Sequence, residues 1–191
     1  MEDGRVDGKI RIVCMLARKL GLICLQTLIM EGYEIKHLFT HKFEPDSETI
    51  REDYNDFINI AKENKIPVHI VDNGEEYYIL KNENFDFIIS CCYRHILPKE
   101  VLSLPKIMPL NLHYSLLPQY KGAKPLQRAL MNKEKETGMT IHKMVEKVDE
   151  GGIIAQAKVK IDEGDDVQKI YEKLYSVTPK LMKETLRRLA S

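Results

Sequence analysis

The sequence predicts an α/β protein with a Rossmann-like, mostly parallel sheet, helices on both faces, and a C-terminal antiparallel hairpin plus helix. Two patterns predict this fold class. In the first two-thirds, continuous apolar runs of strand length alternate with helical patterns, as in parallel sheets that are buried on both faces. After Pro118, two segments rich in strand-forming residues flank a short turn. The length of 191 residues suits one domain over residues 1–191, in which residues 1–9 are expected to form a flexible tail.

The first two-thirds of the chain should contain five buried strands, because each segment is short, apolar and bounded by polar or breaking residues. These segments are residues 10–17, 35–40, 68–71, 85–92 and 110–113. Helical patterns lie between them at residues 22–30, 50–64, 76–81 and 98–104, and a loop containing proline, aspartate and serine lies at 43–49.

The pattern of predicted elements changes in the last third of the chain. Pro125 suits the first turn of a helix that runs to about residue 132. Segments 137–145 and 153–161 alternate and should pair antiparallel around the turn between them. An acidic loop at 162–166 should cap the final helix, residues 167–189, which ends in basic side chains.

Composition excludes several functional classes. The 29 basic and 29 acidic residues balance, which argues against a general nucleic-acid or membrane-surface binder. The polar N-terminus is not a signal peptide, and the longest apolar stretch, 20–30, is too short to span a bilayer. Four cysteines in apolar stretches are expected to be reduced core residues of a cytoplasmic protein: Cys14, Cys24, Cys91 and Cys92.

Several familiar motifs are missing. No G-x-G-x-x-G follows the first strand, and no Walker loop occurs, so a dinucleotide or nucleoside-triphosphate fingerprint is not supported. The histidines lack metal-ligand spacing, and no metal site is expected.

One short segment carries a chemical signal. Asn111 and His113 lie two residues apart at the end of a predicted strand, so they face the same side while Leu112 faces the core. An amide that can donate to an oxyanion therefore sits beside an imidazole that can move a proton. Together with an acid that orients the histidine, such as Asp149 in the segment 147–152, this pair provides the groups that catalyse acyl transfer.

Two polar segments should meet at one edge of the sheet. Residues 93–97 follow the fourth predicted strand, and residues 111–113 end the fifth. Because ligands of parallel α/β sheets bind beyond the carboxyl ends of the strands, both segments are expected at the ligand site.

Four ordered motifs give these residues a family context. They are Asn111-Leu112-His113 with Ser115-Leu116-Leu117-Pro118, then Gly122, then Thr137-Gly138-Met139-Thr140, then Asp149-Glu150-Gly151-Gly152. Together they resemble the folate-dependent formyltransferases. Segments 32–41, 66–68 and 90–96 extend the resemblance to the sugar-nucleotide N-formyltransferases, such as the domain that acts on UDP-4-amino-4-deoxy-arabinose.

The resemblance implies an enzyme that moves a formyl group from 10-formyltetrahydrofolate to a primary amine, which is expected on a nucleotide-linked amino sugar. It implies catalytic roles for Asn111, His113 and Asp149. It also implies that the pterin pocket is lined by two segments: His95, Ile96 and Leu97, and Val145, Glu146, Lys147 and Val148.

The chain departs from the family pattern in two ways. Ala123 stands where the arabinose-type domain has an arginine after the glycine, so one ligand contact differs. Many family members also carry a further C-terminal subdomain, and parts of the acceptor site are therefore expected to be missing or to come from a partner.

Three alternative functions remain open. Glycinamide ribonucleotide formyltransferases are similar in length, but residues 16–21 lack their phosphate-binding loop rich in glycine and asparagine. Segment 122–130 resembles methionyl-tRNA formyltransferases, although a tRNA binder should show a basic excess. A module that binds folate or nucleotide without turnover is the alternative of another class. Small-molecule substrates are expected, membrane and nucleic-acid partners are not, and a homo-oligomer is compatible with the sequence.

Other polar residues receive plainer interpretations. Ser115 is expected to stabilise a turn, and Gly122 to permit a backbone shape that other residues avoid. Four histidines show no partner in the sequence and are predicted to be structural: His37, His41, His69 and His142.

Overall fold

The computed structural model describes residues 9–41 and 48–191. In the helix that begins at residue 48, side chains are described only from residue 54 onward. The predicted tail at 1–9 therefore lies outside the described residues, except for Lys9. Most of the predicted loop at 43–49 does too, and its last two residues begin a helix.

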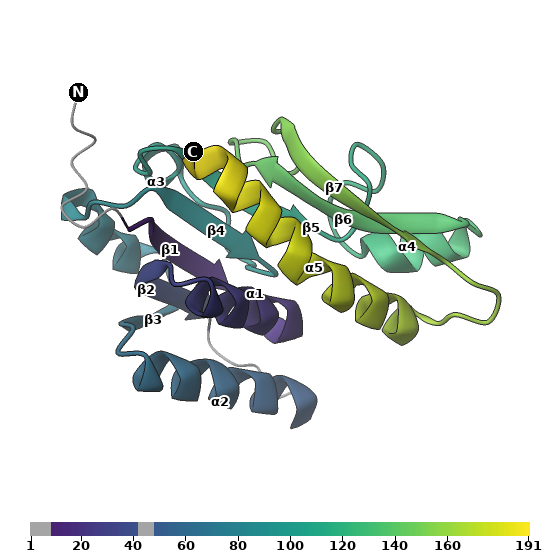
Figure 1. Cartoon of the computed structure of the whole chain (residues 1–191), viewed down its shortest axis with the longest axis horizontal. Coiled ribbons are helices and arrows are strands. Elements are labelled where there is room, and N and C mark those ends of the chain that lie inside the picture. Colours follow the sequence, from purple (N-terminus) through teal and green to yellow (C-terminus); the bar gives the residue numbers. More distant parts are fainter. Residues whose placement is uncertain (1–8, 42–47) are drawn as a thin grey trace.

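A seven-stranded sheet forms the centre of the described chain, in the order β3-β2-β1-β4-β5-β6-β7 (Figure 1). Strands β1 to β5 are parallel, whereas β6 pairs antiparallel with both β5 and β7. This confirms the predicted fold class and the C-terminal hairpin. The strands are β1 (Arg11–Leu16), β2 (Glu34–His41), β3 (Val68–Val71), β4 (Phe87–Cys91), β5 (Met108–His113), β6 (Glu136–Lys143) and β7 (Ile153–Lys160).

Helices cover the two faces unequally. The long helices α1, α2 and α5 bury apolar side chains against one face, whereas the short α3 and the 3₁₀ helix η1 lie over the other (Figure 1). The second face is therefore the more open one. The helices are α1 (Arg18–Met30), α2 (Glu48–Glu63), η1 (Glu75–Asn82), α3 (Lys99–Leu102), α4 (Pro125–Met131) and α5 (Val167–Ala190).

Helix α1 begins at Arg18, four residues before the predicted start. The added first turn contains Gly21, whose missing side chain lets the helix lie close to β1 and α2. A Cβ there would lie 3.1 Å from the Leu16 side chain and 3.2 Å from that of Phe57. Gly32, at φ +79°, follows the helix, where glycine tolerates the left-handed backbone better than other residues do.

Helix α5 begins where the acidic loop was predicted to cap it. The Asp166 carboxylate accepts a hydrogen bond of 2.8 Å from the Lys169 backbone N–H.

None of the helices in the described part of the chain is long and apolar enough to cross a membrane.

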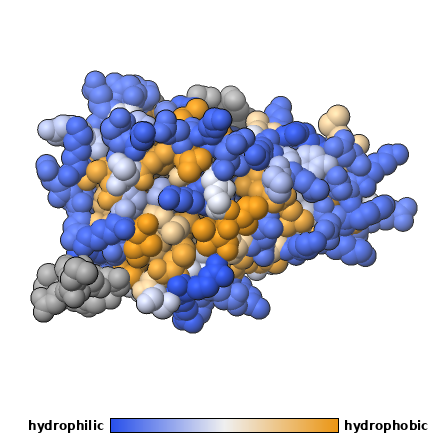
Figure 2. All heavy atoms as spheres, turned by 90° about the horizontal axis from the view of Figure 1, so that it is seen from above, coloured by the Kyte–Doolittle hydropathy of each residue, from blue (hydrophilic) through white to orange (hydrophobic). Residues whose placement is uncertain are grey.

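The surface mixes polar and apolar areas. Seen from above the view of Figure 1, apolar side chains gather in the middle and hydrophilic ones surround them (Figure 2). All four cysteines are free, and Cys14, Cys24 and Cys91 are buried as predicted. Cys92, which was also expected in the core, is only partly buried.

Candidate active site

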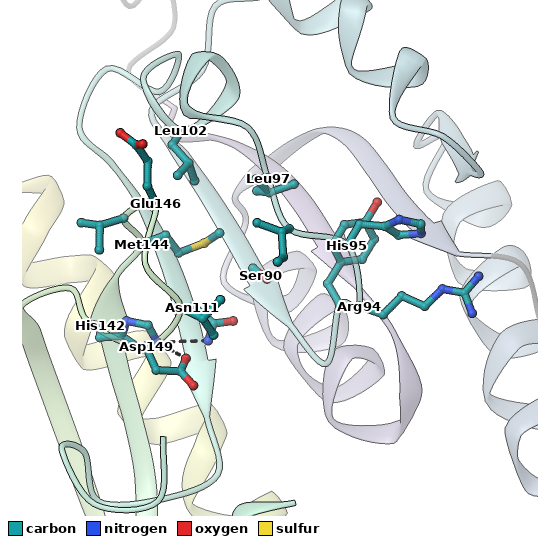
Figure 3. Close-up of a pocket in the computed structure, with 14 residues that line it drawn as sticks. Ser90, Arg94, His95, Leu97, Leu102, Asn111, His142, Met144, Glu146 and Asp149 are labelled. Carbon is teal, nitrogen blue, oxygen red and sulfur yellow. Dashed lines mark hydrogen bonds and ion pairs between the residues drawn. The ribbon is translucent and has the colours of Figure 1, made fainter. Parts of the chain in front are cut away.

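Three polar side chains form a row across the centre of the open face. Ser90 on β4 is the register partner of Asn111 on β5, and Asn111 is the partner of His142 on β6. Because register partners in neighbouring strands face the same side, the three side chains point into one region beside the carboxyl end of β5 (Figure 3). Leu112 faces the opposite core, as the strand alternation predicts.

The structure brings the predicted histidine and acid together. His113 Nδ1 lies 3.3 Å from Asp149 Oδ2, and the two residues are only 8% and 9% exposed. Asp149 lies in the turn between β6 and β7, 36 positions beyond His113 along the chain. The antiparallel hairpin therefore delivers the carboxylate to the end of β5.

A loop between β5 and α4 closes over this pair. The Tyr120 carbonyl lies 3.0 Å from His113 Nε2, and the Gly122 N–H donates a 2.8 Å hydrogen bond to Asp149 Oδ2. Gly122 has a φ of +81°, which explains the predicted need for glycine. The loop thus supplies one acceptor to the imidazole and one donor to the carboxylate.

Thr140 anchors the start of that loop. Its hydroxyl donates to the Ser115 carbonyl at 2.6 Å and accepts from the Leu117 N–H at 3.1 Å. The Ser115 hydroxyl donates to the Gln119 carbonyl at 2.7 Å, which gives Ser115 the predicted turn-stabilising contact. The motifs around residues 115 and 140 therefore belong to one hydrogen-bonded unit.

Gly151 allows the acid-bearing turn to reach the site. A Cβ at Gly151 would collide with the Lys143 carbonyl oxygen, whereas a Cβ at Gly152 would meet nothing within 4 Å. The close approach places the turn against the end of β6. This requirement explains the first glycine after Asp149-Glu150, but not the second.

His142 belongs to the site, so its prediction as a merely structural histidine was wrong. Its Nε2 lies 3.0 Å from Asn111 Nδ2 and 3.4 Å from Asp149 Oδ1 (Figure 3). The signal in the sequence is weak: His142 alternates with Thr140 on a predicted strand. The pairing of that strand with β5 is what gives the position its meaning.

The electrostatics favour an ionised carboxylate. Burial opposes ionisation of Asp149, but hydrogen bonds from His142 and Gly122 N–H and the nearby His113 outweigh it, so its pKa lies below the usual value. Burial lowers the pKa of His113. Asp149 and the Tyr120 carbonyl oppose this shift, and His142 adds to it.

A pocket opens beside these groups, with a volume of about 180 Å³. Six of the seven residues predicted to line a pterin pocket line this cavity, and Lys147 does not. Its wall also includes apolar side chains from α3 and from the end of β6. The lining residues are Ser90, Tyr93, Arg94, His95, Ile96, Leu97, Leu102, Asn111, His142, Met144, Val145, Glu146, Val148 and Asp149.

The pocket wall contains one buried polar atom that makes no hydrogen bond within the described residues, His95 Nε2. The His95 ring lies 5.4 Å from Tyr93 and 6.2 Å from His41, centroid to centroid. At the pocket mouth Ile96 is 73% exposed, whereas Leu97 is buried. The wall therefore combines an apolar surface with a hydrogen-bonding atom that lacks a partner.

Within residues 9–41 and 48–191, no cluster of three or more histidine, cysteine or acidic side chains could hold a metal ion.

Comparison with known proteins decides the family. A model of the formyl transferase family matches residues 23–186. The chain belongs to this family. It is 35% identical to a bifunctional polymyxin resistance protein ArnA of Wigglesworthia glossinidia brevipalpis, over 92% of this chain and 27% of that protein. It is 34% identical to a methionyl-tRNA formyltransferase of Clostridioides difficile, over 93% of this chain and 58% of that one. The chain thus spans less than two thirds of either relative.

Solved structures share the fold. A phosphoribosylglycinamide formyltransferase from Bacillus halodurans has a TM-score of 0.75 and 26% identity, with 95% of each chain covered. The sugar 3N-formyl transferase WlaRD, crystallised in the presence of dTDP and 5-N-formyl-THF, has a TM-score of 0.73 and 21% identity. That match covers 95% of this chain and 63% of the other.

Replacement of Gly151 by alanine should displace the turn that carries Asp149, because the new Cβ collides with backbone rather than with a flexible side chain. We expect Gly151→Ala to lower the free energy of unfolding by about 1–3 kcal/mol. Gly152→Ala is the matched control and should stay within about 0.5 kcal/mol of the wild type. Urea unfolding measures both, and equal effects of the two substitutions would contradict the proposed close approach.

Proposed function

We propose that this protein transfers a formyl group from 10-formyltetrahydrofolate to a primary amine. The observation that carries the proposal is that Asn111 and Asp149 line one pocket and that His113, which is not part of its lining, contacts Asp149. Family membership supports the reaction class. An amide donor, an imidazole and a buried carboxylate are the groups that such an acyl transfer needs.

We assign catalytic roles to the three residues. When the amine adds to the formyl carbon, the formyl oxygen gains negative charge, and the Asn111 amide donates a hydrogen bond to it. One such donor typically lowers the barrier by about 3 kcal/mol. His113 carries the proton between the attacking amine and the leaving nitrogen, and Asp149 orients the imidazole and stabilises its charged form.

We further propose that the pocket holds the pterin of the formyl donor. Its apolar wall, which includes Leu97, Leu102 and Met144, suits a flat heterocycle. The backbone groups of residues 95–97 and 145–148 suit the polar edge of that heterocycle. The unpartnered His95 Nε2 adds one hydrogen-bonding group. The presence of 5-N-formyl-THF in the WlaRD crystals supports the choice of a folate.

For the acceptor we propose the amino group of a nucleotide-linked amino sugar. The 35% identity to an ArnA protein and the fold shared with a sugar 3N-formyl transferase support this choice. The balanced charge of the chain, 29 basic and 29 acidic residues, gives no support to a large nucleic-acid surface. We place the reaction in the cytoplasm, which the four free cysteines support.

Methionyl-tRNA is the second candidate acceptor, because the chain is 34% identical to a methionyl-tRNA formyltransferase. The fold shared with a phosphoribosylglycinamide formyltransferase makes glycinamide ribonucleotide the third. The three acceptors share a primary amine, so the catalytic groups do not distinguish them.

Formyl transfer from 10-formyltetrahydrofolate should be assayed with UDP- and dTDP-linked amino sugars, methionyl-tRNA and glycinamide ribonucleotide. We expect turnover with an amino-sugar nucleotide. His113→Ala should lower kcat by about 10²–10⁴, the usual effect of losing a proton-transfer group, with little change in folate affinity. His69→Ala, a replacement on β3 outside the site, is the control. Folate binding without turnover on any amine would instead indicate a non-catalytic binding module.

Ile96 offers a separate test of the pocket. Its side chain lines the pocket and is 73% exposed, so a charge there should not unfold the protein. Ile96→Asp should weaken binding of 5-formyltetrahydrofolate at least about tenfold, because the carboxylate must be desolvated against the ligand. Met131→Asp on α4 is 81% exposed and outside the pocket, and its Kd should match the wild type. Calorimetric titration measures both, and equal affinities would place the folate elsewhere.

A further inference from the structure

His142 is a buried, titratable side chain to which the proposed mechanism gives no role. It is 2% exposed, lies on β6, and is the register partner of Asn111. Its ring contacts two of the three residues proposed to be catalytic, Asn111 at 3.0 Å and Asp149 at 3.4 Å. A histidine that merely filled the core would not need both contacts.

The partners of the ring fix its hydrogens. His142 Nδ1 lies 3.0 Å from the Lys143 carbonyl oxygen, which can only accept, so Nδ1 carries a hydrogen. In the neutral ring Nε2 is then an acceptor, and it receives one N–H of the Asn111 amide. The amide nitrogen keeps its second N–H for an oxygen in the pocket. His142 thereby fixes which way the Asn111 amide points.

A proton on His142 changes these contacts. The charged ring donates from Nε2 to Asp149 Oδ1, and the Asn111 amide must then turn its oxygen toward the ring. The other oxygen of the same carboxylate already serves His113 Nδ1 and the Gly122 N–H. Two imidazoles thus contact one carboxylate, each at a different oxygen.

Few other charges can compensate a second positive ring. Among the described residues, the polar contacts of the His142 ring are with the Asn111 amide, the Asp149 carboxylate and the Lys143 carbonyl, and only Asp149 is charged. Arg94 and Glu146 are the other charged side chains that line the same pocket. His142 and Arg128 both lower the pKa of His113, because their positive charge disfavours a charged ring nearby. One negative charge therefore supports one positive imidazole at a time.

We propose that His142 is a positioning residue: its neutral ring holds the Asn111 amide through Nε2, and its charged ring pairs with the Asp149 carboxylate that also contacts His113. This inference rests on the formyl-transfer reaction proposed for the site. It explains why a strand opposite Asn111 places a histidine, rather than an apolar residue, at this buried position. It also makes the orientation of the amide depend on where the proton resides.

The shared carboxylate is tested without turnover. NMR titration of the ring nuclei in the folded wild type should show coupled titration of His113 and His142, each curve responding to the other. In the variants His142→Gln and His113→Gln, the remaining histidine should be compared with the wild type. In His142→Gln the pKa of His113 should rise, because the neighbouring ring that opposes the charged form of His113 is removed. Independent wild-type curves, or an unchanged pKa of His113 in His142→Gln, would overturn the proposal.

The positioning role is tested by turnover. Glutamine at residue 142 can still contact both Asn111 and Asp149 but cannot take a charge, whereas leucine can do neither. We expect His142→Leu to lower kcat at least about tenfold and His142→Gln to restore much of the loss. His69→Gln is the matched control, since this half-buried histidine lies on β3.

The two proposals fail in different ways. A wild type that forms no formylated product would reject formyl transfer, and the NMR titration would still decide whether the carboxylate is shared. An active wild type whose Leu and Gln variants both match it would reject the role of His142 and leave formyl transfer standing.

Discussion

The site depends on one buried carboxylate. Asp149 is 9% exposed, yet its pKa lies below the usual value. Burial alone would favour the neutral acid, so the surrounding donors must outweigh the cost of desolvation. Those donors come from three places in the chain: the end of β5, the end of β6 and the loop at Gly122. The carboxylate is thus the point at which the three segments are held together.

This constraint explains the shape of the C-terminal third. The antiparallel strand β6 places His142 beside Asn111, and the tight turn after it returns Asp149 toward His113. Gly151 is needed because the turn passes against the Lys143 carbonyl, which is also the partner of His142 Nδ1. The same few backbone groups therefore position the acid and the second histidine. The parallel strands end at β5, and the hairpin of β6 and β7 extends the sheet by pairing with that strand.

Much of the arrangement follows from the sequence. Strand alternation alone predicts that Asn111 and His113 share a face, and the apolar runs predict the parallel strands. Six of the seven residues expected around the pocket line it, whereas Lys147 does not. The contacts of His142 could not be predicted, because they depend on the antiparallel register between β5 and β6, which are separated in the chain by a loop and helix α4. No local pattern specifies that Asn111 lies opposite His142.

The early start of α1 was missed for a similar reason. Gly21 weakens a helical pattern in the sequence, but in the fold its missing side chain allows close contact with Leu16 and Phe57. Tertiary packing thus outweighs local propensity there. At the candidate active site, tertiary structure is equally decisive. The polar side chains there are hydrogen-bonded to partners from other segments of the chain, and these partners cannot be identified from the local sequence.

A crystal structure of the protein with bound 5-formyltetrahydrofolate would test most directly whether this pocket and these residues form one formyl-transfer site. We predict the pterin in the pocket lined by Leu97 and Met144, with the formyl-bearing side of the ligand directed toward Asn111 and Asp149. A folate bound on another surface, or one whose formyl-bearing side points away from Asp149, would contradict it.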